Sequence, residues 1–164
     1  MNAGAYGGEL KDVVCEVEAW FPEGVRKLHA EELKFAYRSS IFSEIQGGAV
    51  LGVRIHLQKG ISEQIKARMD ELASKRRASQ PLELPSAGST FKRPEGHFAG
   101  TLIEQCGLKG TRIGGAEVSV KHAGFIVNTG GACFLDVLHL IEHVQKIVLN
   151  ETGVTLVPEV KVIQ

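Results

Sequence analysis

Apolar residues recur at every second position within residues 13–20, opposite a polar face that includes Glu16 and Glu18. This period of two predicts a β-strand. The sequence Pro22-Glu23-Gly24 then predicts the turn of a β-hairpin. The apolar face of the first strand is expected to hold Val13, Cys15, Val17 and Ala19. Further strands are expected at 25–28 and 49–57, with a short helical turn at 30–33.

Helical spacing replaces the alternation after Lys59-Gly60, which marks the expected boundary of a second unit. An amphipathic helix is expected from Ser62 to about Ala78, since an apolar residue recurs there every three or four positions. The positions are Ile61, Ile65, Met69 and Leu72. The basic run Lys75-Arg76-Arg77 falls in the last turn, where cations favour the negative end of the helix dipole. A solvated helix end is the plainer interpretation of that run, and an anion site the alternative.

The rest of the chain alternates between helical and strand patterns. A proline-bounded loop is expected at 80–85, and a short helix at 98–106 should end at Gly107. Apolar residues from Phe134 to Val148 share one face of a long helix that Gly153 should close. The remaining expected strands are 116–120, 124–128 and 154–163. These elements predict an α+β chain.

Composition narrows the possible partners. Nineteen basic residues balance nineteen acidic ones among 164 residues, and the sequence pI is about 7.0. A balanced charge gives no overall attraction to nucleic acid or to an anionic membrane. Since apolar runs stay shorter than the roughly 18 residues of a membrane helix, we expect no membrane partner.

The three cysteines, Cys15, Cys106 and Cys133, are odd in number and widely spaced. This pattern argues against a disulfide framework and fits a reducing cytoplasm. No protein partner is indicated by the sequence.

Three short segments, far apart in the sequence, carry the chemistry. They are Tyr37-Arg38-Ser39-Ser40, Gly88-Ser89-Thr90-Phe91-Lys92-Arg93-Pro94 and Pro158-Glu159-Val160. Together with residues 1–8 and 107–119 they resemble the signatures of the UDP-N-acetylenolpyruvoylglucosamine reductase family, flavoenzymes of peptidoglycan precursor synthesis. The resemblance covers nearly the whole chain but starts inside the family's flavin-binding region.

The resemblance implies two domains. Residues 1–56 would be the C-terminal part of an FAD-binding domain, reduced here to a small antiparallel sheet. Residues 57–164 would be an α/β substrate-binding domain. Because part of the flavin-binding region has no counterpart here, we expect this chain alone to retain FAD weakly and to turn over little.

The family reaction has two halves: NADPH reduces FAD, and the hydride then passes to the enolpyruvyl ether of UDP-N-acetylglucosamine. Negative charge develops on the carbon beside the substrate carboxylate, so the site needs a cation, a hydrogen-bond donor and a proton source. The resemblance assigns these roles to Arg38, Glu159 and Ser89. Lys92 would contribute to the positive field around Ser89.

Each of these residues also has a non-catalytic interpretation when the family resemblance is set aside. Arg38 could be an ordinary surface arginine after a helical turn. Ser89 could be an ordinary serine in a turn. Apolar neighbours of Glu159 would favour a neutral carboxylic acid that donates a hydrogen bond. A solvent-facing glutamate fits the same alternation equally well. The family motifs favour the catalytic roles over these non-catalytic interpretations.

The resemblance also implies binding residues. Asn2, Ala3 and Gly4 match the family's flavin-contacting loop, where glycine lets the backbone approach a flat ring. Arg38 would contact the flavin as well. Tyr37, Lys92 and Arg93 would bind the substrate, although many relatives carry asparagine where Arg93 stands.

Motifs for a metal site or a nucleotide-binding loop are weaker than the family motifs. His139-Leu140-Ile141-Glu142-His143 fits an H-x-x-E-H zinc motif, but it lies opposite the apolar stripe of its helix and lacks a further ligand, so we expect no metal. Residues 110–115 lack the spacing of a dinucleotide fingerprint or a P-loop. Two other functions stay open: a catalytically silent UDP-sugar-binding module, and an interaction domain without a small-molecule site.

Overall fold

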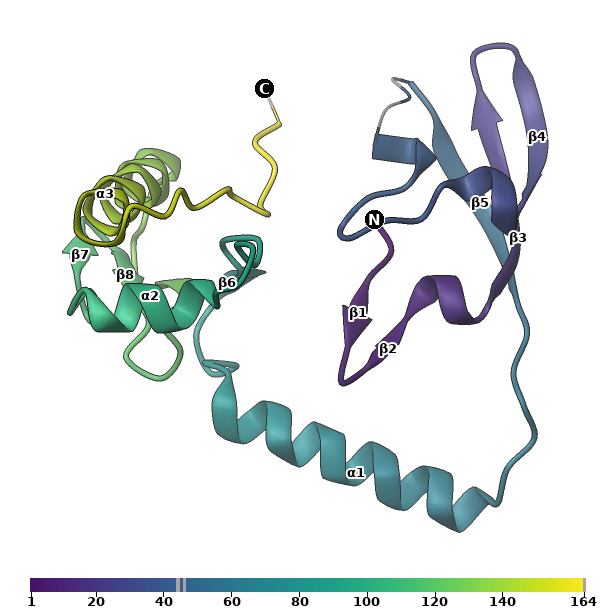
Figure 1. Ribbon diagram of the computed structural model, residues 1–164, viewed down its shortest axis with the longest axis horizontal. Helices are drawn as coiled ribbons and strands as arrows, with labels where there is room; N and C mark the ends of the chain where they lie inside the picture. The colour runs from purple at the N-terminus through teal and green to yellow at the C-terminus, as the bar shows by residue number, and fades with distance from the viewer. Residues whose placement is uncertain (44, 46, 164) are drawn as a thin grey trace. The chain divides into compact units, whose positions relative to one another are not determined.

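A computed structural model describes residues 1–43, 45 and 47–163. It divides into two compact units, Met1–Ile61 and Ser62–Gln164. Small antiparallel sheets and helices make up the chain (Figure 1), which confirms the α+β fold class. The assignment of residues 1–56 and 57–164 to flavin-binding and substrate-binding domains stays a prediction. Among the described helices, none is long and apolar enough to span a membrane.

The first unit is built on a three-stranded antiparallel sheet with the order β4-β3-β5. Strands β3 (Val14–Phe21), β4 (Gly24–His29) and β5 (Ala49–Ile55) confirm the hairpin and the third strand expected from the sequence. The 3-10 helix η2 (Ala30–Leu33) is the expected helical turn. A two-stranded hairpin that the pattern did not predict, β1 (Gly4–Ala5) with β2 (Gly8–Glu9), precedes them. Two further 3-10 helices are η1 (Leu10–Asp12) and η3 (Ile41–Ser43).

The buried face of β3 differs from the predicted one at its start. Val14, Val17, Ala19 and Phe21 are buried, whereas Cys15 is exposed. The pairing of β3 with β5 shifts register between Val14 and Glu16, and such a bulge places an extra residue between two inward-facing ones. The prediction that Cys15 faces the core was therefore wrong, because strict alternation cannot reveal a bulge.

The first core covers β3 more fully than β5. Val17 is 5% exposed, but its direct partner on β5, Val53, is 52% exposed. Leu28 and Leu33 complete the buried cluster from β4 and η2. The core of this unit therefore lies over β3 and β4.

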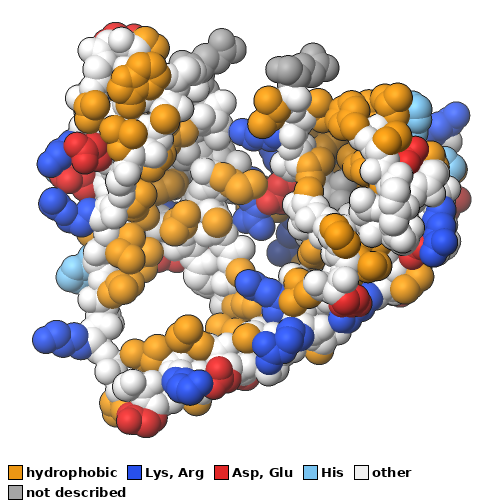
Figure 2. Space-filling view, turned by 180° about the vertical axis from the view of Figure 1, so that it is seen from behind, with side chains coloured by type: hydrophobic (Ala, Val, Ile, Leu, Met, Phe, Trp, Pro, Cys, Tyr) orange, Lys and Arg blue, Asp and Glu red, His pale blue; other side chains and the backbone are white. Residues whose placement is uncertain are grey.

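The second unit begins with α1 (Ser62–Ser79), an 18-residue helix close to the predicted range. Exposed ion pairs link residues three or four positions apart. Lys66 pairs with Asp70 at 3.0 Å, and Arg68 and Lys75 each pair with Glu71 at 2.6 Å. Such pairs stabilise a helix that is exposed to solvent. Lys75, and then Arg68, lower the pKa of Glu71. Hydrophobic and charged side chains are both visible along α1 (Figure 2). In α1, which the structure describes in full, no residue is buried, and the apolar positions Ile65 and Met69 are 49% and 65% exposed, so the helix does not bury the apolar face that the spacing predicted.

A four-stranded antiparallel sheet with the order β6-β9-β8-β7 forms the centre of the second unit. Its strands are β6 (Ser86–Ser89), β7 (Arg112–Ile113), β8 (Ala116–Val118) and β9 (Phe125–Asn128). Helices α2 (Ala99–Gln105) and α3 (Phe134–Thr152) contact each other, and α3 packs on β7 and β8 (Figure 1). Gly107 and Gly153 follow these helices with φ of 68° and 71°, as expected for left-handed terminators.

One predicted element was wrong. The residues after Gly153 form no continuous strand among those described, and a single bridge joins Phe91 to Pro158. Leu156 is nevertheless buried in the second core. The apolar alternation of this segment reflects side chains packed on a neighbouring surface, and Pro158 has no N–H to extend a ladder.

Candidate active site

The serine segment and the glutamate segment run antiparallel to each other in the second unit. Lys92 N donates to Val157 O at 2.8 Å, and Glu159 N donates to Thr90 O at 2.8 Å. Phe91 and Pro158 form the bridge between these two bonds. The two bridged residues are 67 positions apart in the sequence, so tertiary pairing alone brings the backbone of Glu159 next to the residue that follows Ser89.

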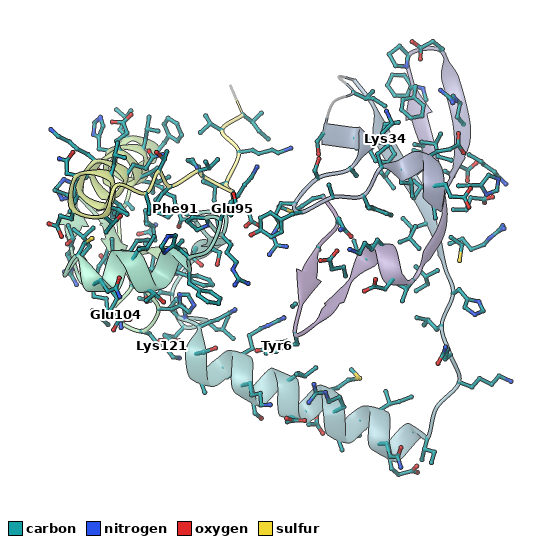
Figure 3. The ribbon with its side chains drawn as sticks, viewed as in Figure 1. Tyr6, Lys34, Phe91, Glu95, Glu104 and Lys121 are labelled. Atoms are coloured by element: carbon teal, nitrogen blue, oxygen red, sulfur yellow. The ribbon has the colours of Figure 1, made fainter. Side chains whose placement is uncertain are left out.

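Thr90 fixes the serine segment to the central sheet. Its side chain is 3% exposed, and Oγ1 accepts a hydrogen bond from Ile126 N at 3.1 Å. Its backbone N–H donates to Gly124 O at 2.8 Å. Phe91, which Figure 3 labels, is 5% exposed and belongs to the second core. Buried anchors on the carboxyl side of Ser89 therefore hold its backbone in place.

Ser89 itself is exposed and Glu159 is half-buried. Gly88 precedes the serine with a φ of 86°, at an irregularity in the pairing of β6 with β9. This left-handed conformation is readily available to glycine. The arrangement offers an accessible hydroxyl and a carboxyl group on adjacent segments of backbone.

Cationic side chains follow the serine. Lys92 is half-buried, and Arg93 places its guanidinium carbon 3.9 Å from the centre of the exposed Phe98 ring. A guanidinium stacked on an aromatic ring keeps its hydrogen-bond donors available at the ring's edge. This segment can therefore present positive charge close to Ser89.

Arg38 lies in a two-residue turn of the first unit. Ala36 and Ser39 exchange backbone hydrogen bonds of 3.2 Å in both directions, which leaves Tyr37 and Arg38 as the two central residues. Arg38 has a φ of 52°, an uncommon conformation for a residue with a side chain. Its guanidinium carbon lies 5.1 Å from the centre of the Tyr37 ring.

The glycine-rich start of the chain forms the β1–β2 hairpin, with Tyr6 and Gly7 at its turn. Figure 3 shows Tyr6 at the end of this hairpin. Asn2 is buried, and its side chain takes part in three hydrogen bonds within the unit. Ala3 O accepts a hydrogen bond from Leu10 N at 3.0 Å.

Glu9 pairs with Gly4 across the hairpin. Hydrogen bonds from Lys11 and then Asn2 lower the pKa of the Glu9 carboxyl group, with a smaller contribution from the charge of Arg38. Glu9 thus remains ionised between the glycine loop and the arginine turn.

The predicted site residues fall into two groups. Ser89, Lys92, Arg93 and Glu159 belong to the second unit, whereas Asn2, Ala3, Gly4, Tyr37 and Arg38 belong to the first. Backbone pairing joins Glu159 to Thr90, the residue that follows Ser89. The meeting of both groups around one substrate stays a prediction, as do their roles.

Motif reading missed two residues that shape these segments. Glu9 and Thr90 lie within the quoted motifs or beside them, yet their roles depend on hydrogen bonds to other segments, and the Thr90 hydroxyl bonds to Ile126 N, 36 positions away. No signal in a single sequence marks such contacts. For metals, the described residues contain no group of three His, Cys, Asp or Glu side chains able to hold an ion.

A family model described as "UDP-N-acetylenolpyruvoylglucosamine reductase, C-terminal domain" matches residues 80–163. The matched range contains Ser89, Lys92, Arg93 and Glu159. The chain belongs to the UDP-N-acetylenolpyruvoylglucosamine reductase family.

Members of the reductase family match the chain from end to end. The reductase of Caldanaerobacter subterraneus is 54% identical over 164 residues, which cover 99% of this chain and 54% of that protein. The reductase of Latilactobacillus sakei is 50% identical, with the same coverage of 99% and 54%. The crystal structure of the Thermus caldophilus reductase gives a TM-score of 0.83 at 38% identity, covering 98% of this chain and 57% of that one. The chain therefore spans about half the length of the relatives it matches.

Proposed function

We propose that this chain supplies the catalytic residues for reducing the enolpyruvyl ether of UDP-N-acetylglucosamine to UDP-N-acetylmuramate, with FAD as cofactor and NADPH as reductant. The observation that carries the proposal is the pairing of the serine segment with the glutamate segment. It brings the backbone of the half-buried Glu159 beside that of Thr90, the residue after the exposed Ser89, which supports a joint role of this hydroxyl and this carboxyl group in acid chemistry beside a developing enolate.

Each proposed role follows from the chemistry of the side chain. Arg38 pairs with the substrate carboxylate, because a guanidinium stays charged and offers a planar pair of donors. Ser89 donates a proton to the carbon beside that carboxylate. Glu159, in its protonated form, donates a hydrogen bond to the developing enolate. Tyr37, Lys92 and Arg93 hold the rest of the substrate.

In this proposal the ring of the flavin lies against the β1–β2 hairpin of the first unit. Small residues dominate the β1–β2 hairpin, and a Cβ atom added at Gly7 would meet no atom within 4 Å. Bound FAD would supply the hydride, which originates from NADPH. Asn2, Ala3, Gly4 and Arg38 would position the ring through backbone groups and the guanidinium.

The proposed reaction belongs to peptidoglycan precursor synthesis, and we place it in the cytoplasm. The three cysteines are free, in accord with a reducing compartment.

A chimaera tests the proposed function. In it, this chain replaces the matched 164 residues of the Caldanaerobacter relative, and NADPH oxidation is followed with and without the enolpyruvyl substrate. We expect oxidation that depends on the substrate, and a loss of about 100-fold or more when Arg38 becomes Lys, because a bidentate contact is lost. Oxidation at the same rate without the substrate would contradict the proposal.

A second function, a catalytically silent UDP-sugar-binding module, is favoured by one observation. Ser89, Lys92, Arg93 and Glu159 all belong to the second unit, whereas the glycine hairpin belongs to the first. Titration calorimetry of the unaltered chain with UDP-N-acetylglucosamine, together with a flavin absorbance scan, separates the two functions. Binding heat without flavin, combined with an inactive chimaera, would favour the module.

A further inference from the structure

We propose that Asn2 is a positioning residue that connects the glycine hairpin to the turn carrying Arg38. The inference rests on the proposed function, in which Gly4 faces the flavin ring and Arg38 binds the substrate carboxylate. It assigns to the Asn2 side chain a role inside the protein rather than at the cofactor.

The hydrogen bonds of Asn2 reach three separate segments. Nδ2 donates to Glu9 Oε2 at 2.8 Å and to Ala36 O at 3.2 Å, while Oδ1 accepts from Lys11 N at 3.0 Å. The residue is 2% exposed. Both amide protons and the carbonyl oxygen are thereby engaged, so any contact of Asn2 with a ligand would come from its backbone.

The contact with Ala36 acts on the arginine turn. Ala36 is one of the two residues that close this turn, through mutual hydrogen bonds with Ser39. Arg38 holds a φ of 52° inside it, a conformation that surrounding contacts must maintain. The bond from Asn2 Nδ2 is a contact of this kind from outside the turn.

The contact with Glu9 acts on the glycine hairpin. A Cβ atom added at Gly4 would lie 2.9 Å from Glu9 Cγ, so the carboxylate side chain packs closely against Gly4. Lys11 Nζ lies 2.9 Å from Glu9 Oε2, the same oxygen that accepts the hydrogen bond from Asn2. A continuous path of contacts therefore runs from Gly4 through Glu9 and Asn2 to Ala36, which closes the turn that carries Arg38.

The backbone of Asn2 determines which variants are informative. Its φ is 41°, a left-handed conformation that Asn, Asp and Gly tolerate better than Ala. Asn2→Asp keeps the shape and the acceptor for Lys11 N, but it loses both donated bonds. Asn2→Gly removes the side chain without backbone strain.

Backbone ¹⁵N relaxation of the unaltered chain and its variants tests the proposal without requiring turnover. In the unaltered chain we expect order parameters of about 0.85 at Tyr37, Arg38 and Ser39, falling below about 0.6 in Asn2→Asp and Asn2→Gly. The hairpin turn at Glu23 should stay unchanged. Asn150→Asp, at an exposed asparagine of α3, is the matched control.

A swap of the amide and the carboxylate between positions 2 and 9 distinguishes the Asn2–Glu9 hydrogen bond from the Asn2–Ala36 hydrogen bond. In the double variant Asn2→Asp with Glu9→Gln, the amide at position 9 can donate to the new carboxylate, whereas Ala36 O still lacks its donor. We expect the swap to restore order in the β1–β2 hairpin and to leave the turn at Arg38 mobile. Restored order at the turn would overturn a direct link through Ala36.

Two further outcomes would overturn the proposal: an unchanged turn in Asn2→Asp and Asn2→Gly, or loosening that spreads through β3 and β4. The latter would give Asn2 a general structural role. NADPH oxidation by the chimaera at the same rate without the enolpyruvyl substrate bears on the proposed function alone, so the two failures are distinguishable.

Discussion

At the scale of single residues, Thr90 links the sheet to the candidate site. Its hydroxyl group accepts from Ile126 N, and its carbonyl group accepts from Glu159 N. Thr90 directly follows β6, and this polar residue is only 3% exposed. Sequence could identify Ser89 and Glu159 only through their family motifs, and it could not identify Thr90 as their common anchor.

Thr90→Val should lower the stability of the second unit. The variant keeps the shape of the side chain but leaves Ile126 N buried without an acceptor, which costs about 1–3 kcal/mol. Urea unfolding followed by circular dichroism measures the loss. Thr101→Val, at an exposed position of α2, is the control and should change stability by less than about 0.5 kcal/mol. Equal stabilities of the two variants would show that the hydroxyl contact is unimportant.

At the scale of elements, Asp136 caps α3 and ties it to the sheet. Its Oδ2 accepts from Cys133 N at 3.0 Å and from Gly115 N at 3.2 Å. These bonds lower the pKa of Asp136, that from Cys133 most. The close approach of Asp136 also constrains Gly114, where an added Cβ would collide with the Asp136 carboxylate.

The lowered pKa of Asp136 predicts an acid-dependent contribution to stability. Stabilisation by the carboxylate is fully present above the ordinary value of 3.8, and it is lost as the pH falls through the lower value of the folded state. Asp136→Asn should therefore melt at a lower temperature than the unaltered chain at pH 7, with the difference closing towards pH 2. Thermal melts of both proteins, with Glu142→Gln as the exposed control on α3, measure this. A difference that stays constant with pH would contradict it.

Element prediction succeeded where a local signal was sufficient. The helices followed from spacing and from Gly107 and Gly153, and the β3–β4 hairpin from alternation and a turn sequence. It failed at Cys15, because a bulge changes which face of the strand a residue occupies. It also failed after Gly153, where the apolar alternation reflects side-chain packing and only a single bridge forms, at Pro158, among the described residues. The β1–β2 hairpin was missed because glycine and alanine carry no strand pattern.

At the scale of the whole molecule, each unit has its own core. The cluster around Val17 and Leu33 contains residues of the first unit only, and the cluster around Ile103 and Val144 contains residues of the second only. Destabilising one core should therefore act mainly within its own unit.

Val17→Ala tests this separation, with its strand partner Val53→Ala as the control. Val17 is buried, so its truncation should cost about 2 kcal/mol, whereas the half-exposed Val53 should cost less than about 1 kcal/mol. Hydrogen exchange read by mass spectrometry should show faster exchange in residues 1–61 for Val17→Ala and unchanged exchange in β8 and β9. Faster exchange throughout both units would show that the cores are coupled.

The central claim is that Ser89 protonates the substrate carbon beside Glu159 and the bound carboxylate. The most direct measurement is turnover of the chimaera in deuterated water, with the product analysed by NMR for Ser89→Ala and for Ser86→Ala, an exposed serine of the same strand. We expect solvent deuterium on the carbon next to the carboxylate, a fall in rate of about 100-fold to 10,000-fold for Ser89→Ala, and an unchanged rate for Ser86→Ala. Full activity of Ser89→Ala, or solvent deuterium only at the methyl carbon, would contradict the account.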